Sequence, residues 1–248
     1  MNLLIDGKAA AVSGASAGLG LAAARALAAE GVRVAICGRD RKRIESAAES
    51  IAGLAVPIVA DVSTATGATG FVERARSELG AVDILVANAG GPPPGTFSTT
   101  DVDAYLGALE LNLISVVAMC KAAVPAMQTA RWGRVVAITS IAARQPIPDL
   151  ILSNTARAGL TGFLKTLALE VAADGVTVNS LQPGLHDTDR LRGLHGGNTS
   201  QLARSVPVQQ IGRPEDFGAV AAFLCSDHAR FITGSAIAVD GGAHRALL

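Results

Sequence analysis

The sequence predicts an α/β protein whose centre is an open, doubly wound parallel sheet of about seven strands, with helices on both faces. Short runs rich in Val, Ile and Ala alternate with longer Ala- and Leu-rich stretches along the whole chain. Several of the short runs are apolar throughout, as expected of strands that are covered on both faces. No break in composition marks a linker, so we predict one domain over residues 1–248.

The elements follow one another in a regular strand–helix order. The predicted strands are Ala9–Ser13, Val32–Cys37, Val56–Ala60, Ile84–Ala87, Val135–Thr139, Val176–Leu181 and Ala236–Val239. The predicted helices are Leu19–Glu30, Lys42–Ile51, Ala68–Leu79, Val102–Met127, Ser153–Ala173 and Glu215–Leu224. A helix between two strands is typical of parallel connections.

One stretch, from Pro183 to about Val206, fits neither pattern and is rich in Gly, His, Asp and Arg. It is too long for an ordinary connection, and two interpretations stay open. It is either a lid over a binding site or a disordered surface loop.

The composition excludes several classes of protein. The 21 basic and 21 acidic residues balance, so we predict no attraction to nucleic acid or to an anionic membrane. The three cysteines are far apart and are interpreted as reduced core thiols. We find no signal peptide pattern, and no run approaches the roughly 18 apolar residues of a membrane span. We therefore expect a cytoplasmic protein with no metal site.

A glycine-rich turn follows the first predicted strand and leads into the first helix. It reads Ser13-Gly14-Ala15-Ser16-Ala17-Gly18-Leu19-Gly20. Glycines allow the backbone to turn tightly and to approach a pyrophosphate, which lies at the positive end of the following helix. With a strand before it, a helix after it and a second strand that ends at Cys37, the turn predicts a dinucleotide-binding Rossmann fold.

Further short motifs follow the turn in a fixed order. They are Asp61-Val62, Asn88-Ala89-Gly90, Asn112, Ser140, Pro183-Gly184, Gly212-Arg213-Pro214-Glu215-Asp216 and Val239-Asp240-Gly241-Gly242. In this order, and with the GxxxGxG spacing of the turn, the chain resembles the short-chain dehydrogenase/reductase family over essentially its whole length. Its 3-oxoacyl-acyl-carrier-protein reductase-like members are the most similar in appearance.

The resemblance implies that a nicotinamide dinucleotide lies along the turn and the strand ends. The implied cofactor-binding residues are Ser13, Gly14, Ser16, Gly18, Leu19, Gly20, Arg39, Asp61, Val62, Asn88, Ala89, Gly90, Arg157, Pro183, Gly184, His186 and Thr188.

The end of the second strand favours NADP(H) over NAD(H). In this motif a carboxylate about 20 residues after the glycines usually holds the ribose diol of NAD. Here that position is Gly38, and Arg39 follows it. A small residue followed by Arg leaves room for a 2′-phosphate and supplies a donor fork for it. In the alternative interpretation, Arg39 belongs to a solvated helix start and Asp40 binds the ribose of NAD.

The catalytic motif of the family is altered in this chain. The resemblance implies a serine that positions the carbonyl, here Ser140, and an asparagine that holds a relay water, here Asn112. The family's proton-donating tyrosine and its ribose-binding lysine fall on Ser153 and Arg157. The only tyrosine, Tyr105, is interpreted as a packing residue.

Both replacements weaken acid–base chemistry. An aliphatic hydroxyl is a much weaker acid than a phenol, and an arginine stays protonated where a lysine can exchange its proton. Loss of a general acid typically costs ~10²–10⁴ in rate. Residues 153 and 157 nevertheless share one helical face.

Three functional interpretations remain open. The first is an active oxidoreductase that reduces a carbonyl, 3-oxoacyl compounds included, or oxidises the matching alcohol. Its proton would come through water, through Ser140 or through another group such as His186, and Arg144 and Asp149 are candidates to line its substrate cleft. The second is a lyase or isomerase that reuses the pocket, and the third is a dinucleotide-binding protein without turnover.

The long helices Val102–Met127 and Ser153–Ala173 have apolar residues on more than one face. Family members usually associate through these helices and through the C-terminal strand. We therefore expect a homotetramer, with a dimer as the second choice.

Overall fold

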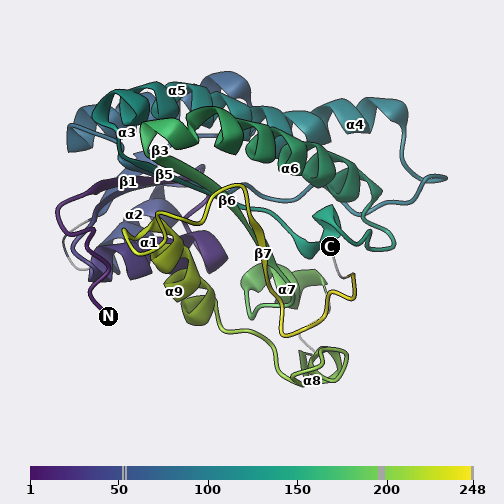
Figure 1. Ribbon diagram of the computed structural model, residues 1–248. Coiled ribbons are helices and arrows are strands. Elements are labelled where there is room, and N and C mark those ends of the chain that lie inside the picture. The colour runs from purple at the N-terminus through teal and green to yellow at the C-terminus, as the bar shows by residue number, and fades with distance from the viewer. Residues whose placement is uncertain (52, 54, 195–198, 247–248) are drawn as a thin grey trace.

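The computed structural model describes residues 1–51, 53, 55–194 and 199–246. Its centre is a seven-stranded parallel sheet in the order β3-β2-β1-β4-β5-β6-β7 (Figure 1). The strands are β1 Ala9–Val12, β2 Arg33–Gly38, β3 Ala55–Val59, β4 Ile84–Ala87, β5 Gly133–Ile138, β6 Val176–Pro183 and β7 Ala236–Val239. The predicted doubly wound sheet and all seven predicted strands are confirmed.

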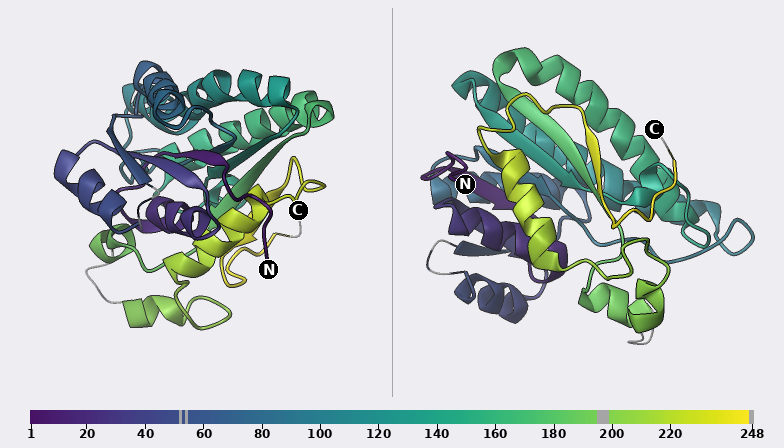
Figure 2. Two further views of the ribbon diagram at one scale, coloured as in Figure 1. Left: turned by 90° about the vertical axis from the view of Figure 1, so that its left-hand side faces the viewer. Right: turned by 60° about the horizontal axis from the view of Figure 1, so that its bottom comes forward.

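Helices cover both faces of the sheet (Figures 1 and 2). They are α1 Gly18–Ala29, α2 Arg41–Glu49, α3 Ala65–Leu79, α4 Val102–Leu109, α5 Ser115–Ala130, α6 Ile151–Val171, α7 Asp189–Leu194, α8 Thr199–Ala203 and α9 Pro214–Cys225.

The core consists of two apolar layers, one on each face. Phe71 of α3, Met119 of α5 and Leu160 of α6 lie in one layer, which also contains Ala9 and Ala11 of β1. The other layer holds side chains of α1, α2 and α9 together with the alternate strand residues, Ala10 and Val12 among them. Because successive strand side chains point to opposite faces, one apolar strand supplies both layers.

Two predicted segments differ from the structure. The single long helix expected over Val102–Met127 is divided by a π-helical turn, Glu110–Ile114, between α4 and α5. The stretch from Pro183 to Val206 contains the short helices α7 and α8, so it is neither structureless nor a disordered loop over its described part. Residues 195–198 of that stretch lie outside the described residues.

The run Val102–Ala130 is long and apolar enough to cross a membrane if length and composition alone are considered. It is not an uninterrupted apolar run, because Asp103, Glu110 and Lys121 lie within it. In the structure this run packs on the sheet, with Val116, Met119 and Ala123 in the core, and core helices commonly have this composition.

The three cysteines are buried and unpaired, as predicted. Burial raises the pKa of the Cys37, Cys120 and Cys225 thiols to about 12. They therefore behave as small apolar core residues.

Candidate functional site

The carboxyl ends of β1 and β4 are joined by side-chain hydrogen bonds beneath the glycine turn. Ser13 Oγ donates to Asn88 O at 2.7 Å, and Asn88 N donates to Ser13 Oγ at 2.8 Å. Asn88 Nδ2 donates to Gly14 O at 2.9 Å. These bonds fix the first turn residue at the point where the strand order reverses, which is where open α/β sheets bind ligands.

The turn itself needs glycine for two physical reasons. Gly14 and Gly18 have φ of +57° and +59°, in the left-handed region that favours glycine. A Cβ at Gly20 would lie 2.8 Å from Asn88 Nδ2 and would overlap Gly14 O. The backbone is therefore packed closely against the strand ends at the N-terminus of α1, and this end can accept a pyrophosphate.

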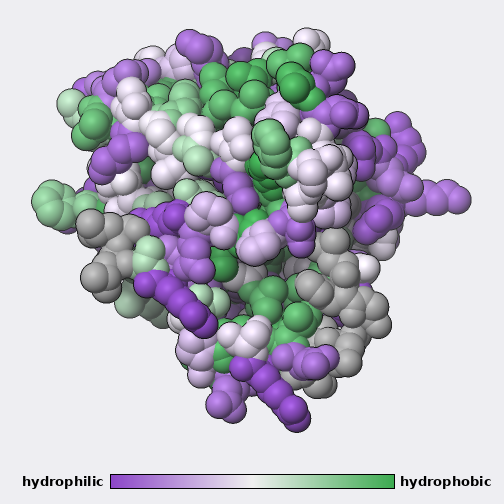
Figure 3. All heavy atoms as spheres, turned by 90° about the vertical axis from the view of Figure 1, so that its right-hand side faces the viewer, coloured by the Kyte–Doolittle hydropathy of each residue, from purple (hydrophilic) through white to green (hydrophobic). Residues whose placement is uncertain are grey.

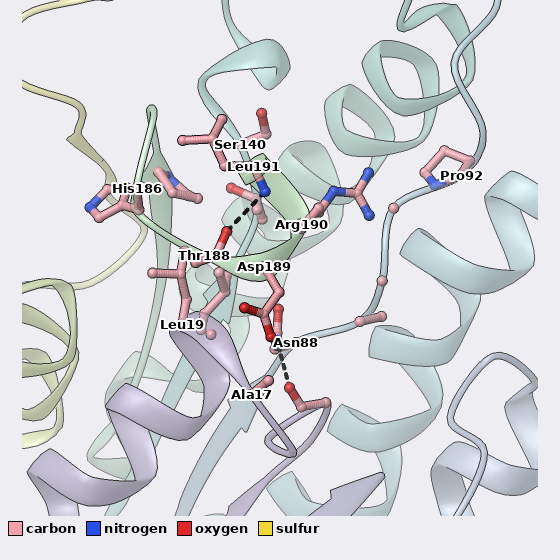
Figure 4. Close-up of a pocket in the computed structure, with 18 of the residues that line it drawn as sticks. Ala17, Leu19, Asn88, Pro92, Ser140, His186, Thr188, Asp189, Arg190 and Leu191 are labelled. Carbon is pink, nitrogen blue, oxygen red and sulfur yellow. Dashed lines mark hydrogen bonds between the residues drawn. The ribbon is translucent and has the colours of Figure 1, made fainter. Parts of the chain in front are cut away.

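A cavity of about 610 Å³ opens at these strand ends. Its walls come from the turn, from the ends of β4, β5 and β6, and from the first residues of α7 (Figure 4). The predicted site residues on its wall are Gly14, Gly18, Leu19, Asn88, Ala89, Gly90, Ser140, Arg157, Pro183, Gly184, His186 and Thr188.

Other predicted cofactor residues lie behind this wall or beside it. Ser13 is buried and holds Asn88, and the carboxyl end of β2 meets the turn at Ser16. Val62 is buried behind Asp61. Asp61 is exposed and accepts from Ser63 N at 3.0 Å, and this hydrogen bond lowers the pKa of its carboxyl group.

The end of β2 leaves little space for a side chain at Gly38. A Cβ at Gly38 would already lie 3.1 Å from Ser16 Cβ. Arg39 is exposed and is not on the cavity wall, whereas Arg43 is. Asp40 caps α2 by accepting from Arg43 N at 2.9 Å, which places Arg43 in the first helical turn. The sequence analysis missed Arg43, although the Asp40 cap could have indicated its position.

The catalytic end of the cavity contains Ser140 and Arg157. Ser140 Oγ accepts from Ala142 N at 3.1 Å, so its hydroxyl hydrogen remains available to donate into the cavity. Arg157 Nη1 donates to Ile138 O at 2.8 Å, while its buried Nε has no partner among the described residues. Burial, with a smaller effect of Arg190, lowers the pKa of Arg157 to about 10, so the side chain stays charged near neutral pH.

Asn112 lies in the π-helical turn, which packs against α6. Its Nδ2 donates to Gly90 O at 2.7 Å, and its buried Oδ1 has no partner within the described part of the chain. Single π-helical turns inside helices often occur at functional sites. Buried polar atoms without a protein partner are commonly satisfied by an internal water.

Ser153 is not on the described cavity wall. It is half-buried in the first turn of α6, and Leu150 lines the cavity just before that helix. The chain's only tyrosine, Tyr105, is half-buried in α4 and does not line the cavity either.

His186 lines the cavity, but its ring packs into the protein. It lies edge-on to Phe217 of α9 with 5.2 Å between the ring centroids, and Nδ1 lies 3.3 Å from Gly184 O. Burial lowers the pKa of this imidazole, so the ring is neutral near pH 7. A neutral, packed ring is a poor proton donor, which argues against the predicted acid role of His186.

The segment after β6 covers the glycine turn, as the lid interpretation predicted. A Cβ at Gly18 would lie 3.4 Å from Thr188 Cγ2, and Asp189, Arg190 and Leu191 complete that side of the cavity (Figure 4). Asp189, Arg190 and Leu191 were absent from the predicted set.

The opposite rim is formed by the loop after β4. Gly95 N donates to Asp149 O at 2.7 Å, and Ile151 N donates to Gly95 O at 3.2 Å, which joins this loop to the one before α6. Pro92 and Pro94 line the cavity from this loop. Arg144 and Asp149 are exposed and are not on its described wall, which agrees with the favoured interpretation that they are surface-loop residues rather than cleft residues.

Comparisons with known proteins agree with this geometry. The model of the family described as enoyl-(acyl carrier protein) reductase matches residues 14–244. The 3-oxoacyl-(acyl-carrier-protein) reductase FabG of Chlamydia muridarum is 33% identical over 246 residues, which cover 98% of this chain and 99% of that protein.

Two solved structures are similar over nearly the whole chain. L-Sorbose reductase from Gluconobacter frateurii, in complex with NADPH and L-sorbose, has a TM-score of 0.92 at 33% identity and covers 100% of both chains. A short chain oxidoreductase from Pseudomonas aeruginosa PAO1, bound to NADPH and described as containing an atypical catalytic center, has a TM-score of 0.91 at 32% identity. That match covers 98% of this chain and 99% of the other.

Proposed function

The chain belongs to the short-chain dehydrogenase/reductase family, and from this membership we propose that it is an NADP(H)-dependent oxidoreductase acting without a catalytic tyrosine. It reduces a carbonyl group, 3-oxoacyl compounds included, or oxidises the matching alcohol. The observation that carries the proposal is that Ser140 and Arg157 share one cavity with the glycine turn.

The residues present fit a nicotinamide dinucleotide. The tightly packed glycines at the N-terminus of α1 suit the pyrophosphate, and the unpartnered Nε of Arg157 suits a ribose hydroxyl. When bound, the reduced nicotinamide supplies the hydride that adds to the carbonyl carbon.

NADP(H) is the proposed form because the charge at the end of β2 is positive and the space beside Gly38 is filled by Ser16. Arg39 directly follows this strand end, and Arg43, in the first turn of α2, lines the cavity, so both can reach toward a 2′-phosphate bound there. NADPH is also the cofactor bound in the Gluconobacter and Pseudomonas structures.

Ser140 is proposed to donate its free hydroxyl hydrogen to the carbonyl oxygen. Arg157 holds positive charge near that oxygen as it becomes an alkoxide. The alkoxide takes its proton from solvent through a water held at Asn112 Oδ1, a buried polar atom without a partner among the described residues. The atypical catalytic center of the similar Pseudomonas oxidoreductase supports a reductase that departs from the usual motif.

The test is NADPH oxidation by the purified protein with a panel of 3-oxoacyl thioesters, ketones and aldehydes. Ser140→Ala should lower kcat/KM by about 100-fold or more, because it removes the hydroxyl that is proposed to donate to the carbonyl oxygen. Ser153→Ala should change it less than about 3-fold, since Ser153 is off the described wall. Ser153→Tyr combined with Arg157→Lys should raise general ketone reduction if only the usual proton donor is missing.

Two outcomes would replace this proposal. If the parent binds NADPH but is inert on every carbonyl while the double variant is active, the protein is a dinucleotide binder without turnover. If a substrate is converted with no change in cofactor absorbance, the protein is a lyase or isomerase.

A further inference from the structure

Arg190 reaches across the cavity from α7 toward the loop after β4 (Figure 4). Its guanidinium lies over Gly91, where a Cβ would overlap it. The missing side chain at Gly91 is therefore what leaves room for the arginine. Arg190 is consequently directed toward the rim made by Gly91 and Pro92 and away from the glycine turn.

Arg190 brings a further positive charge to a cavity whose wall already carries the buried Arg157 and, from the start of α2, Arg43. Its charge adds to the effect of burial in lowering the pKa of Arg157 to about 10. Among the described residues, no carboxylate lies within ion-pair distance of either guanidinium. Asp189, the described carboxylate on the wall, lies 4.0 Å from Arg192 instead.

Two cations that face one cavity without a counter-ion repel each other, and an anion between them relieves that cost. The phosphates of a dinucleotide already have a place at the glycine turn and at α1. The Arg190 guanidinium lies at Gly91 instead, beside the joined loops that form the opposite rim. We take this rim as the place of the substrate.

We propose that Arg190, together with Arg157, binds an anionic group of the carbonyl substrate, so that the substrate class is an oxoacid or a phosphorylated ketone. That the substrate has a carbonyl group rests on the proposed function. That it also has an anionic group rests on the two guanidinium groups. The Arg190 guanidinium presents a planar donor fork that matches a carboxylate or a phosphate, and Arg157 adds positive charge to the same cavity. An anion held there also orients the neighbouring carbonyl toward Ser140.

The test is calorimetric titration of the protein, with and without saturating NADPH, using matched charged and neutral ligands. One pair is 3-oxobutanoate with its methyl ester, and the other is dihydroxyacetone phosphate with dihydroxyacetone. The parent should bind the charged member of one pair about 10- to 100-fold more tightly, the effect of charge-assisted hydrogen bonds. The pair that shows this preference identifies the anion as a carboxylate or a phosphate.

Arg190→Gln should abolish the preference for the charged ligand over the neutral one, and Arg190→Lys should keep part of it. Gly91→Ala should weaken this preference by displacing the guanidinium. Arg192→Gln is the matched control on the same helix, because Arg192 Nε donates to Asp187 Oδ1 at 2.9 Å and is not on this cavity wall. This control should retain the full preference.

Equal affinity for both members of each pair in the parent, or an unchanged preference in Arg190→Gln, would overturn the inference. So would an Arg190→Gln variant that loses affinity for NADPH alone, because Arg190 would then hold the cofactor. Tight binding of the charged ligand without NADPH oxidation would leave the anion site in place and contradict the oxidoreductase proposal instead.

Discussion

Arg157 carries a charged guanidinium into the buried face of α6, where 7% of the residue is exposed. Its Nη1 hydrogen bond to Ile138 O compensates only part of the lost hydration, because Nε is left without a described partner. The lowered pKa of Arg157 reflects the free-energy cost of burying its charge, since burial disfavours the charged form. We interpret the residue as one that is retained for binding rather than for stability.

Replacement of Arg157 by Met should therefore leave the protein without ligand as stable as the parent or more stable. The folded-state pKa of about 10 is below the ordinary value of an arginine, so the penalty is fully present below about pH 10. The stability of the parent should rise as the pH increases above about 10, and the Met variant should lack this rise. Thermal melts of both proteins at several pH values measure this effect.

Melting temperatures measured with and without NADPH distinguish a role of Arg157 in cofactor binding from a role in stability. Added NADPH should raise the melting temperature of the parent and raise that of Arg157→Met much less. A marked loss of stability in Arg157→Met without ligand would show instead that the arginine mainly supports the fold.

At the scale of elements, the start of α2 carries the proposed cofactor preference. The Asp40 cap fixes the helix start, so that Arg39 precedes the helix and Arg43 reaches the cavity wall. NADPH should bind more tightly than NADH by about 1.5–3 kcal/mol, the contribution of charge-assisted hydrogen bonds to the 2′-phosphate. Each of Arg39→Ala and Arg43→Ala should remove part of that preference, and the double variant should remove most of it.

Arg41→Ala is the control for these variants, because Arg41 Nη1 lies 3.3 Å from Glu45 on the exposed side of the same helix. It should keep the full preference, and NADH affinity should change little in all four variants. Equal affinities for NADPH and NADH in the parent, measured by calorimetry, would contradict the proposed preference for NADP(H).

Elements whose apolar sequence pattern follows from burial could be predicted from the sequence. Elements that depend on local backbone geometry could not. The strands could be read because apolar runs such as Ile84–Ala87 are covered on both faces. The π-helical turn at Asn112 could not, because an i→i+5 hydrogen bond leaves no mark in helical periodicity. The short helix α7 was hidden by its length, for few residues show a helical repeat.

The residues of the site were likewise predictable only in part. Backbone features, such as the glycine turn and Pro183-Gly184, lie on the cavity wall because motifs at strand ends fix their own position. Side-chain directions depend on the packing of distant segments. His186 points to Phe217 and Arg190 points to Gly91, and neither direction can be read from the sequence around it.

At the scale of the whole molecule, two exposed apolar places on the described surface are candidates for assembly. At one, Phe97, Val102 and Leu106 lie on and before α4, with exposed fractions of 86%, 81% and 70%. Figure 3, which faces the α4 end of the molecule, shows hydrophobic side chains over this helical layer. The other is Phe231, which is 98% exposed in the segment that precedes the edge strand β7.

Large exposed apolar side chains that cluster on a surface typically mark a contact with another chain. Two separate self-complementary surfaces on one chain generate a tetramer, because each forms its own twofold interface. We therefore predict a homotetramer at micromolar concentration, measured by light scattering. Leu106→Arg should disrupt the contact at α4, and Phe231→Arg should disrupt the contact at β7, each giving a dimer.

The two substitutions together should give a monomer, because each removes a different interface. Glu49→Arg on α2 is the matched control, since that helix lies near the opposite edge of the sheet from β7 and away from both surfaces. It should stay tetrameric, and circular dichroism should show that all four proteins are folded. A parent protein that is monomeric at micromolar concentration would contradict the prediction, and a parent dimer unaffected by Phe231→Arg would restrict assembly to the α4 surface.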